Sequence, residues 1–148
     1  MSALEIGIRP ARPDDFPAVT ALLSVCQLPT NDLTHDILST FFVAESGKQI
    51  VGACGFEVSG TDGLLRSLAV APDARGNRLG ERLVARCEAA ARSGGVKNLY
   101  LLTTTADAYL RRLGYVDVLR ESAPPAVSTH PQFRGLCPAS AKCLKKLL

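Results

Sequence analysis

The sequence predicts an α/β protein in which helices flank a central mixed β-sheet. Two observations favour this class. Strand-like and helix-like segments alternate in the order β-α-α-β-β-β-α-β-α-β-β, and the composition, with 47% hydrophobic and 21% charged residues, is that of a soluble globular protein. The length of 148 residues suits one domain with a substantial core, which we expect to span residues 1–148.

The first half of the chain is predicted to contain two helices and a β-hairpin. Residues 6–11 have the pattern of a short strand, and residues 12–26 open with acids and a proline before apolar residues recur at helical spacing. A polar loop that leads into a second, shorter helix is expected within residues 28–41. Residues 41–58 then give two strands joined by a turn that contains Gly47.

The second half is predicted to alternate strands with helices. We expect, in order, a strand at 64–70, a long helix at 78–93, a strand at 98–104, a short helix at 106–113 and a strand at 115–120. Gly114 ends the short helix, and Thr104 and Asp107 are spaced like a capping box at its start. The proline-rich segment 122–136 is predicted to be a loop, and residues 139–148 a strand, with a helix as the alternative.

Composition and charge argue against several classes of function. The net charge of +3 is too small to favour a nucleic-acid partner, and the basic residues are interspersed along most of the chain. The N-terminus lacks the apolar core of a signal peptide, and no apolar run reaches membrane-spanning length. We therefore expect a cytoplasmic protein without a membrane or nucleic-acid partner.

The cysteines and histidines predict neither disulfides nor a metal site. The five cysteines are an odd number without a CxxC pair, and we expect them to be reduced and mostly buried. His35 and His130 are isolated in the sequence, and the residues around them lack the spacing of metal ligands. No metal cofactor is therefore predicted.

The stretch LAVAPDARGNRLGERLV, residues 68–84, predicts an anion-binding site. Arg75, Arg78 and Arg82 crowd the start of the predicted helix, where the helix dipole disfavours cations unless an anion neutralises them. Gly76 and Gly80 let the backbone approach a ligand, and the N–H groups of a helix start bind phosphate well. A solvated basic helix end with a glycine turn is the alternative. The stretch contains neither a Walker A motif nor a GxGxxG motif.

The same stretch resembles the acetyl-CoA loop of the GNAT superfamily of N-acetyltransferases, whose signature is (Q/R)-x-x-G-x-(G/A). Arg75 matches the first position and Gly80 the last, while Arg78 stands where the family has a glycine. The stretch IRPARPDDFPAVTALL resembles the family's first strand and helix, and ADAYLRRLGYV resembles its closing helix. The resemblance extends from Ile6 to Val118 and implies the GNAT acyl-CoA N-acyltransferase fold.

The resemblance implies that acetyl-CoA is the cosubstrate of a direct acetyl transfer to an amine. Backbone groups of residues 68–70 would hold the pantetheine arm, and amides of the loop would wrap the pyrophosphate. The acetyl thioester would lie where the parallel strands 64–70 and 98–104 splay. The cofactor-binding residues implied in this way are Leu68, Ala69, Val70, Arg75, Gly76, Asn77, Arg78, Leu79, Gly80, Thr103 and Tyr109.

Two positions depart from the family's catalytic pattern. Aligned through the stretch SLAV, the family's frequent general base corresponds to Leu64, and its frequent general acid corresponds to Leu110. Tyr109 would point about 100° away from Leu110 on the helix, so packing is the favoured interpretation of this tyrosine. Thr103 aligns with an asparagine that binds pantetheine in the family, and we include it among substrate-binding candidates.

Glu57 and Arg66 are the candidates for the acceptor site. Glu57 lies near the end of a central strand, where it could act as the catalytic base through water or hold the substrate amine. An exposed acid at a strand end is the alternative. Arg66 lies on the same strand face as Leu64, and its guanidinium suits a substrate carboxylate, phosphonate or arsonate. The alternative for Arg66 is a structural pair with Glu57 on the neighbouring strand.

The resemblance also narrows the acceptor. Several stretches, among them LCPASAKCLKKLL, resemble the arsenic-resistance branch of the superfamily, and LLTTTADAYLRRLGY resembles the acetyltransferase part of N-acetylglutamate synthase. Both resemblances imply a small amino-acid-like acceptor with an α-amino group and an anion, and the first implies a role in arsenic or xenobiotic resistance. A non-catalytic acyl-CoA sensor and a protein-amine acetyltransferase are the alternatives. A homodimer is left open.

Overall fold

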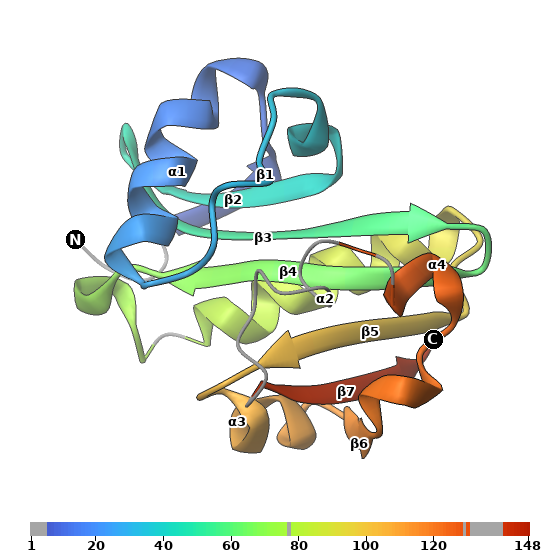
Figure 1. Cartoon of the computed structure of the whole chain (residues 1–148). Helices are drawn as coiled ribbons and strands as arrows, with labels where there is room; N and C mark the ends of the chain where they lie inside the picture. The colour runs from blue at the N-terminus through green and yellow to red at the C-terminus, as the bar shows by residue number, and fades with distance from the viewer. Residues whose placement is uncertain (1–5, 77, 129, 131–140) are drawn as a thin grey trace. The chain divides into compact units, whose positions relative to one another are not determined.

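Seven strands form one mixed sheet within the residues that the computed structural model describes, which are 6–76, 78–128, 130 and 141–148 (Figure 1). Their order across the sheet is β1-β2-β3-β4-β5-β7-β6. The strands are β1 (Ile6–Pro10), β2 (Phe41–Ser46), β3 (Gln49–Ser59), β4 (Asp62–Val70), β5 (Asn98–Thr103), β6 (Val116–Val118) and β7 (Lys142–Leu147). The α-helices are α1 (Phe16–Val25), α2 (Leu79–Ser93), α3 (Asp107–Arg112) and α4 (Pro125–Ser128).

The sheet contains one parallel pair among antiparallel ones. β4 and β5 are parallel, with Asp62–Leu64 in register with Asn98–Tyr100, which confirms the parallel arrangement predicted for these strands. The pairs β1–β2, β2–β3, β5–β7 and β6–β7 are antiparallel. β3 and β4, joined by a tight turn, run in opposite directions (Figure 1). The mixed sheet with helices confirms the predicted fold class.

The chain divides into two compact units. The first contains Met1–Phe56 and Ser67–Ala89, and the second contains Glu57–Arg66 and Ala90–Leu148. β3, β4 and α2 each contribute residues to both units, so the division does not follow the order of the sequence. The extent of a single domain over residues 1–148 stays a prediction.

In the first unit, α1 and α2 pack on opposite faces of the sheet. Neighbouring residues of a strand point to opposite faces. Ala53 of β3 belongs to a buried cluster with Val19 and Leu23 of α1. At the adjacent Gly52, a side chain would meet Leu83 of α2 at 2.9 Å. The glycine therefore allows α2 to lie close against β3.

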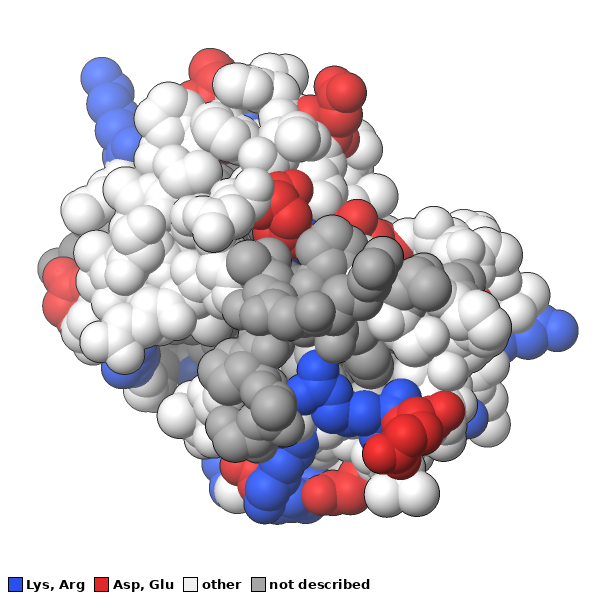
Figure 2. Space-filling model, viewed as in Figure 1, with Lys and Arg blue, Asp and Glu red and all other residues white. Residues whose placement is uncertain are grey.

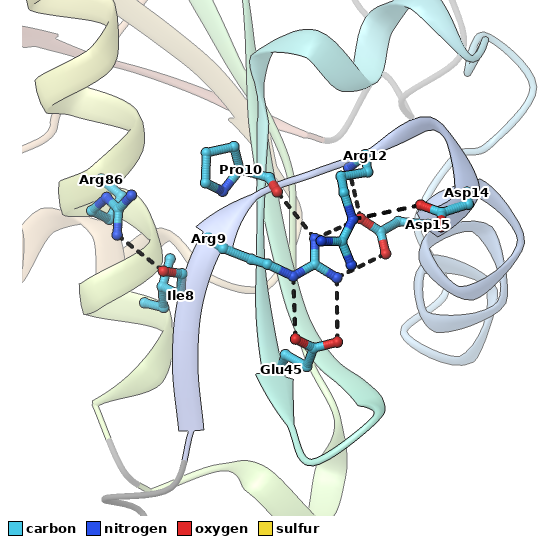
Figure 3. A network of polar contacts seen from close by, with 8 residues as sticks. All are labelled: Ile8, Arg9, Pro10, Arg12, Asp14, Asp15, Glu45 and Arg86. Atoms are coloured by element: carbon cyan, nitrogen blue, oxygen red, sulfur yellow. Dashed lines mark hydrogen bonds and ion pairs between the residues drawn. The ribbon is translucent and has the colours of Figure 1, made fainter.

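Arg9 of β1 binds two carboxylates near the start of α1 (Figure 3). Its guanidinium donates to the carboxylate oxygens of Asp15 at 2.8 and 3.0 Å, and to those of Glu45 on β2 at 3.2 and 3.3 Å. Asp15 also accepts a hydrogen bond from the backbone N–H of Arg12 at 2.7 Å. The hydrogen bonds from Arg9 are the main cause that lowers the pKa of both Asp15 and Glu45.

Replacing Asp15 with asparagine should destabilise the protein at neutral pH by about 2 kcal/mol, because Arg9 loses a charged hydrogen-bond partner. The folded-state pKa of Asp15 is lowered, so its contribution is present above its unfolded pKa and is lost as the pH falls through the folded value. Urea unfolding at pH 7 and at about pH 3 measures the effect. The difference between wild type and Asp15→Asn should shrink at the acidic pH, and an undiminished difference would contradict this account.

In the second unit, part of a segment predicted to be a loop packs on the sheet. A 3₁₀ turn at Arg120–Ser122 is followed by α4. Ala123 and Val127 are buried in a cluster with Leu64 and Tyr100, which lie on β4 and β5. The prediction of a loop over 122–136 is therefore wrong for α4, while residues 129 and 131–136 lie outside the described residues.

The second, shorter helix that the sequence predicts within residues 28–41 is only a 3₁₀ turn at Asp36–Thr40. Leu38 is the buried residue of this turn, and the buried Leu33 before it is five positions away, a spacing that does not place the two on one face of an α-helix. At the other end of the chain, β7 confirms the strand that the sequence favours over a helix, since it pairs with β5 along its whole length.

The cysteines of the described part of the chain carry thiols and form no disulfide, as predicted. Cys54, Cys87 and Cys143 are buried, and Cys26 is half-buried. Burial raises the pKa of the Cys143 thiol to about 11, which keeps it protonated at neutral pH. Cys137 lies outside the described residues.

Charged side chains of both signs lie beside one another on the face that Figure 2 shows. In the second unit, Arg111 lies 2.6 Å from Asp117 and 3.0 Å from Asp107, and Lys142 lies 3.1 Å from Asp107. Exposed pairs of this kind contribute little to stability. Among the helices that the structure describes, none combines the length and the apolar composition needed to cross a membrane.

Candidate active site

The loop from β4 to α2, in the first unit, presents backbone N–H groups at the start of a helix. Gly76 has a φ of +93°, and a side chain there would meet open space. The hydrogen-bonded ladder of α2 begins with the N–H of Arg82, which donates to the carbonyl of Arg78 at 3.0 Å. The N–H groups of Leu79 and Gly80 therefore precede the ladder, where a helix offers them no acceptor.

Three arginines surround this helix start. Arg75 Nε donates to the carbonyl of Val70 at 3.1 Å, and Arg82 donates to a carbonyl of β1 at 3.4 Å. Arg78 lies 4.0 Å from the carboxylate of Glu81. A carbonyl oxygen accepts one hydrogen bond from each of Arg75 and Arg82, but it does not neutralise their charge. The helix start keeps an excess of positive charge, which suits a phosphate group.

Arg78 has the backbone conformation that favours glycine. Its φ is +55°, in the left-handed region, where the Cβ of an ordinary residue is crowded by the following carbonyl oxygen. The signature's glycine at this position therefore has a backbone reason, and the arginine in its place is strained.

The variant Arg78→Gly should be more stable than Arg78→Ala by about 1 kcal/mol. Both substitutions remove the guanidinium, but only glycine relieves the left-handed strain. Thermal or urea unfolding of the two variants without any ligand measures the difference. Equal stability of the two variants would show that the backbone at residue 78 relaxes out of this conformation.

The predicted cofactor residues of β4 lie directly before the loop. Ala69 is buried, and Leu68 and Val70 are half-buried. Ser67, just before them, has a φ of +60°, which interrupts the regular strand. Asn77 of the loop lies outside the described residues, so its predicted role stays a prediction.

Thr103, in the second unit, closes the turn between β5 and α3. Its Oγ1 accepts a hydrogen bond from the N–H of Ala106 at 3.0 Å. The capping box predicted for Thr104 and Asp107 is wrong, because α3 has no side-chain cap and Asp107 contacts Arg111 and Lys142 instead. The binding of pantetheine or of the acceptor by Thr103 stays a prediction.

Tyr109 and Leu110 differ in burial, as their neighbouring positions on α3 require. Leu110 is buried in the core, whereas Tyr109 is half-buried, with the guanidinium of Arg112 5.6 Å from the centre of its ring. Tyr109 is therefore partly covered by its surroundings, and its ring contacts the guanidinium of Arg112. Its contact with the cofactor stays a prediction.

Glu57, Arg66 and His130 meet in the second unit. Arg66 Nη1 donates to Glu57 Oε2 at 2.8 Å, and His130 Nε2 lies 2.6 Å from the same oxygen. The hairpin of β3 and β4 brings the first two together, and the N–H of His130 donates to the carbonyl of Val127 at the end of α4. The Arg66 side chain is fully buried, while those of Glu57 and His130 are 31% and 14% exposed.

These contacts bear on both acceptor-site candidates. Glu57 is half-buried and not an exposed strand-end acid, and two hydrogen bonds hold its carboxylate. Arg66 forms an ion pair with Glu57 on the neighbouring strand, which is the alternative role that the sequence left open. The full burial of Arg66 favours this structural pair over a direct contact with an anionic group of the acceptor, which stays untested.

A small pocket of about 100 Å³ lies beside this cluster. Its walls come from β3, β4, α4 and His130, and its titratable lining residues are Glu57, Asp62 and His130. A volume of this size holds several water molecules or a small polar group. The pocket therefore exposes two carboxyl groups and an imidazole to a small ligand.

The Glu57 carboxyl is ionised at neutral pH. Burial raises its pKa, but hydrogen bonds from His130 and Arg66 outweigh burial, so the pKa lies below its ordinary value. Both hydrogen bonds use Oε2, and Oε1 takes part in neither of them.

Sequence reasoning missed His130. The histidine is 73 positions from Glu57 and follows a segment predicted to be a loop. A weak signal was present: two consecutive prolines stand at the start of α4, and Ala123 and Val127 are four positions apart, so both can face the sheet. Those two residues dock the segment and bring His130 to the pocket.

Comparison with known proteins identifies the family. A family model described as an acetyltransferase (GNAT) domain matches residues 38–117, which are more than half of the chain. This chain belongs to the GNAT acetyltransferase family. The matched GNAT residues include the loop from β4 to α2 as well as Glu57 and Arg66.

The GNAT chain is similar to two curated proteins over different extents. An amino-acid acetyltransferase of Ectopseudomonas mendocina (strain ymp) is 36% identical over 95 residues, which are 64% of this chain and 22% of that protein. An uncharacterised N-acetyltransferase of Chlorobaculum tepidum is 27% identical over 138 residues, with 86% of each chain covered. The chain thus spans about a fifth of the length of the amino-acid acetyltransferase that it matches.

Among solved structures, the GNAT chain is similar to N-acetylglutamate synthase from Neisseria gonorrhoeae complexed with coenzyme A and N-acetyl-glutamate. The TM-score is 0.83 with 22% sequence identity, and the match covers 97% of this chain and 35% of that one. This likeness confirms the GNAT acyl-CoA N-acyltransferase fold.

The two positions that depart from the GNAT catalytic pattern lie in the core. Leu64 and Leu110, which stand where the resemblance places the general base and the general acid, are both buried core residues. Neither position can exchange a proton. The titratable groups of the pocket instead come from β3, β4 and His130, which follows α4 in the sequence.

Proposed function

We propose that this GNAT chain transfers the acetyl group of acetyl-CoA to the primary amine of a small, amino-acid-like acceptor. The observation that carries the proposal is the loop from β4 to α2. There, the N–H groups of a helix start and an excess of positive charge occur together in a member of an acetyltransferase family. When bound, acetyl-CoA supplies an activated acetyl thioester.

The residues of the loop fit a pyrophosphate. The N–H groups of the first turn of α2 precede the helical ladder, Arg75 and Arg78 are exposed, and open space lies beside Gly76. We assign the pyrophosphate to this turn and the pantetheine arm to the backbone of residues 68–70. The full set of proposed cofactor-binding residues is Leu68, Ala69, Val70, Arg75, Gly76, Asn77, Arg78, Leu79, Gly80, Thr103 and Tyr109.

The acceptor side is assigned to Glu57 and Arg66. The ionised Glu57 carboxylate lines a pocket of about 100 Å³ and can hold an ammonium group, while Arg66 holds that carboxylate from its buried side. The names of two similar proteins, amino-acid acetyltransferase and N-acetylglutamate synthase, support an amino-acid-like acceptor. An α-amino group needs less help from a base than a lysine does, because its pKa is near 8.

The role in arsenic or xenobiotic resistance belongs to this proposal. It requires that phosphorus or arsenic analogues of amino acids serve as acceptors. A thiol-release assay tests the proposal with acetyl-CoA and a panel of amino acids, their phosphonate and arsonate analogues, uncharged amines and a lysine peptide. We expect thiol release with at least one small amino-acid-like compound and a far lower rate with the peptide. Release with the peptide alone would point to a protein-amine acetyltransferase, and binding of acetyl-CoA without release to a sensor module.

A further inference from the structure

We propose that three arginines close the β1 edge of the sheet against strand pairing with a second copy of this chain. The inference concerns a surface of the first unit and goes beyond the proposed acetyl transfer. Among the described strands, β1 stands at one end of the sheet order and has β2 as its neighbour. A strand in that position presents a row of backbone groups that pair readily with another strand unless something covers them.

The register of β1 shows which of its backbone groups face outward. The N–H of Ala11, the residue after β1, donates to the carbonyl of Phe41 on β2 at 2.9 Å. In an antiparallel pair, the backbone groups of alternate residues point to the same side, so Gly7 and Arg9 also face β2. The backbone groups that face away from β2 therefore belong to Ile6, Ile8 and Pro10.

Two arginines of α2 cover the first two outward carbonyls. Arg82 donates to the carbonyl of Ile6 at 3.4 Å, and Arg86 donates to that of Ile8 at 3.2 Å, as Figure 3 shows for the second contact. The spacing fits, because four residues of a helix rise about 6 Å and two residues of a strand rise about 6.6 Å. The ring of Phe42 on β2 also holds Arg86, whose guanidinium carbon lies 4.9 Å from the ring centre.

Arg9 and Pro10 cover the end of the same edge. Arg9 Nη1 donates to the carbonyl of Pro10 at 3.1 Å, and the ion pairs with Asp15 and Glu45 fix the position of this guanidinium (Figure 3). Proline has no backbone N–H, so the outward edge lacks a donor at this residue. An incoming strand would therefore find all three outward carbonyls of β1 bonded to guanidinium groups and one donor missing.

A second copy of this chain is the partner that the arrangement opposes most strongly. Two β1 edges would pair about a two-fold axis, so each copy would bring the same arginines to the interface. Pairing would require the guanidinium groups of both copies to leave their carbonyls, and it would bring like charges together. An uncharged strand of another protein would meet the first of these two penalties without the second.

The test uses an edge variant that combines Arg82→Ala with Arg86→Ala. The matched control combines Arg92→Ala with Lys97→Ala, which removes the same charge at two exposed positions of the second unit. Sedimentation velocity over a range of protein concentrations measures self-association, and circular dichroism checks that both variants are folded. We expect the self-association constant of the edge variant to exceed that of the wild type at least about tenfold, while the control variant matches the wild type.

Hydrogen exchange followed residue by residue locates the contact between the two copies. Strand pairing through β1 engages the outward N–H groups of Ile6 and Ile8, so their exchange in the edge variant should slow as the protein concentration rises. A third variant adds Gly7→Lys to the edge variant. A side chain at Gly7 meets open space, and a lysine at a sheet edge disfavours pairing, so this variant should return to the self-association constant of the wild type.

An edge variant that associates no more than the control variant would overturn the proposal. Association that leaves exchange at Ile6 and Ile8 independent of concentration would also overturn it, because the contact would then lie elsewhere. A wild type that already protects these two N–H groups as its concentration rises would contradict the closed edge directly. The assays contain neither acetyl-CoA nor an acceptor, so their outcome does not depend on the proposed acetyl transfer.

Discussion

Replacing Gly80 with aspartate should abolish the binding of acetyl-CoA while the protein stays folded. Gly80 lies in the first turn of α2, where a new carboxylate interacts favourably with the helix dipole. The same carboxylate would stand beside the proposed pyrophosphate and repel it. We expect the affinity for acetyl-CoA to fall at least about a hundredfold, which corresponds to about 2.7 kcal/mol.

Thermal unfolding with and without acetyl-CoA measures this effect. At a concentration of about 100 times its Kd, acetyl-CoA should stabilise the wild type by about 2.7 kcal/mol and raise its Tm by about 5–10 °C. The Gly80→Asp variant should show no shift. Gly80→Asn has nearly the same shape without the charge, so the difference between the two variants isolates the repulsion. An equal shift for the wild type and Gly80→Asp would remove the basis for placing the pyrophosphate at this turn.

Replacing Arg66 with methionine should lower kcat/KM by about ten- to a hundredfold and leave the binding of acetyl-CoA intact. Methionine fills much of the space of the fully buried side chain, so the main change is the loss of the charged partner of Glu57. The half-buried carboxylate would then be less favourably ionised, because burial raises its pKa and one of two opposing hydrogen bonds is gone. The pH at which activity appears should therefore move upward.

The choice of acceptors in this experiment separates two roles of Arg66. If Arg66 acts by holding Glu57, acceptors with and without a carboxylate lose kcat/KM in parallel, and this is the result we expect from its burial. Arg66→Lys, which keeps the charge but not the geometry of the guanidinium, should lose less. A loss confined to acceptors that bear an anion would instead place Arg66 at that anion.

Much of the fold could be predicted because its signals are local. The apolar spacing of α2, the turn at Gly47 and the alternation of strands with helices follow from neighbouring residues, and the structure confirms them. The loop before α2 could be predicted for the same reason, since its glycines and arginines lie within a few positions of one another. Arg78 shows the limit of the motif, because the left-handed φ that explains the usual glycine appears only in the structure.

The cluster of Glu57, Arg66 and His130 could be predicted only in part because its contacts are long-range. The strand pattern identified Glu57 and Arg66 and allowed them to pair, since a short hairpin joins their strands. His130 reaches them only because Ala123 and Val127 dock on Leu64 and Tyr100, a packing interaction between segments far apart in sequence. Single-sequence reasoning sees the prolines of that segment and predicts a loop, whereas tertiary burial makes it a short helix.

The fate of the acetyl group tests the central claim most directly. The wild type is incubated with acetyl-CoA labelled with ¹³C at the carbonyl and with the best acceptor of the panel, and NMR follows the label while thiol release is counted. We predict that the label appears in an amide of the acceptor in the same amount as the released thiol. Label that remains in the thioester, or that appears as free acetate despite the acceptor, would contradict the assignment of this chain as an N-acetyltransferase of small amines.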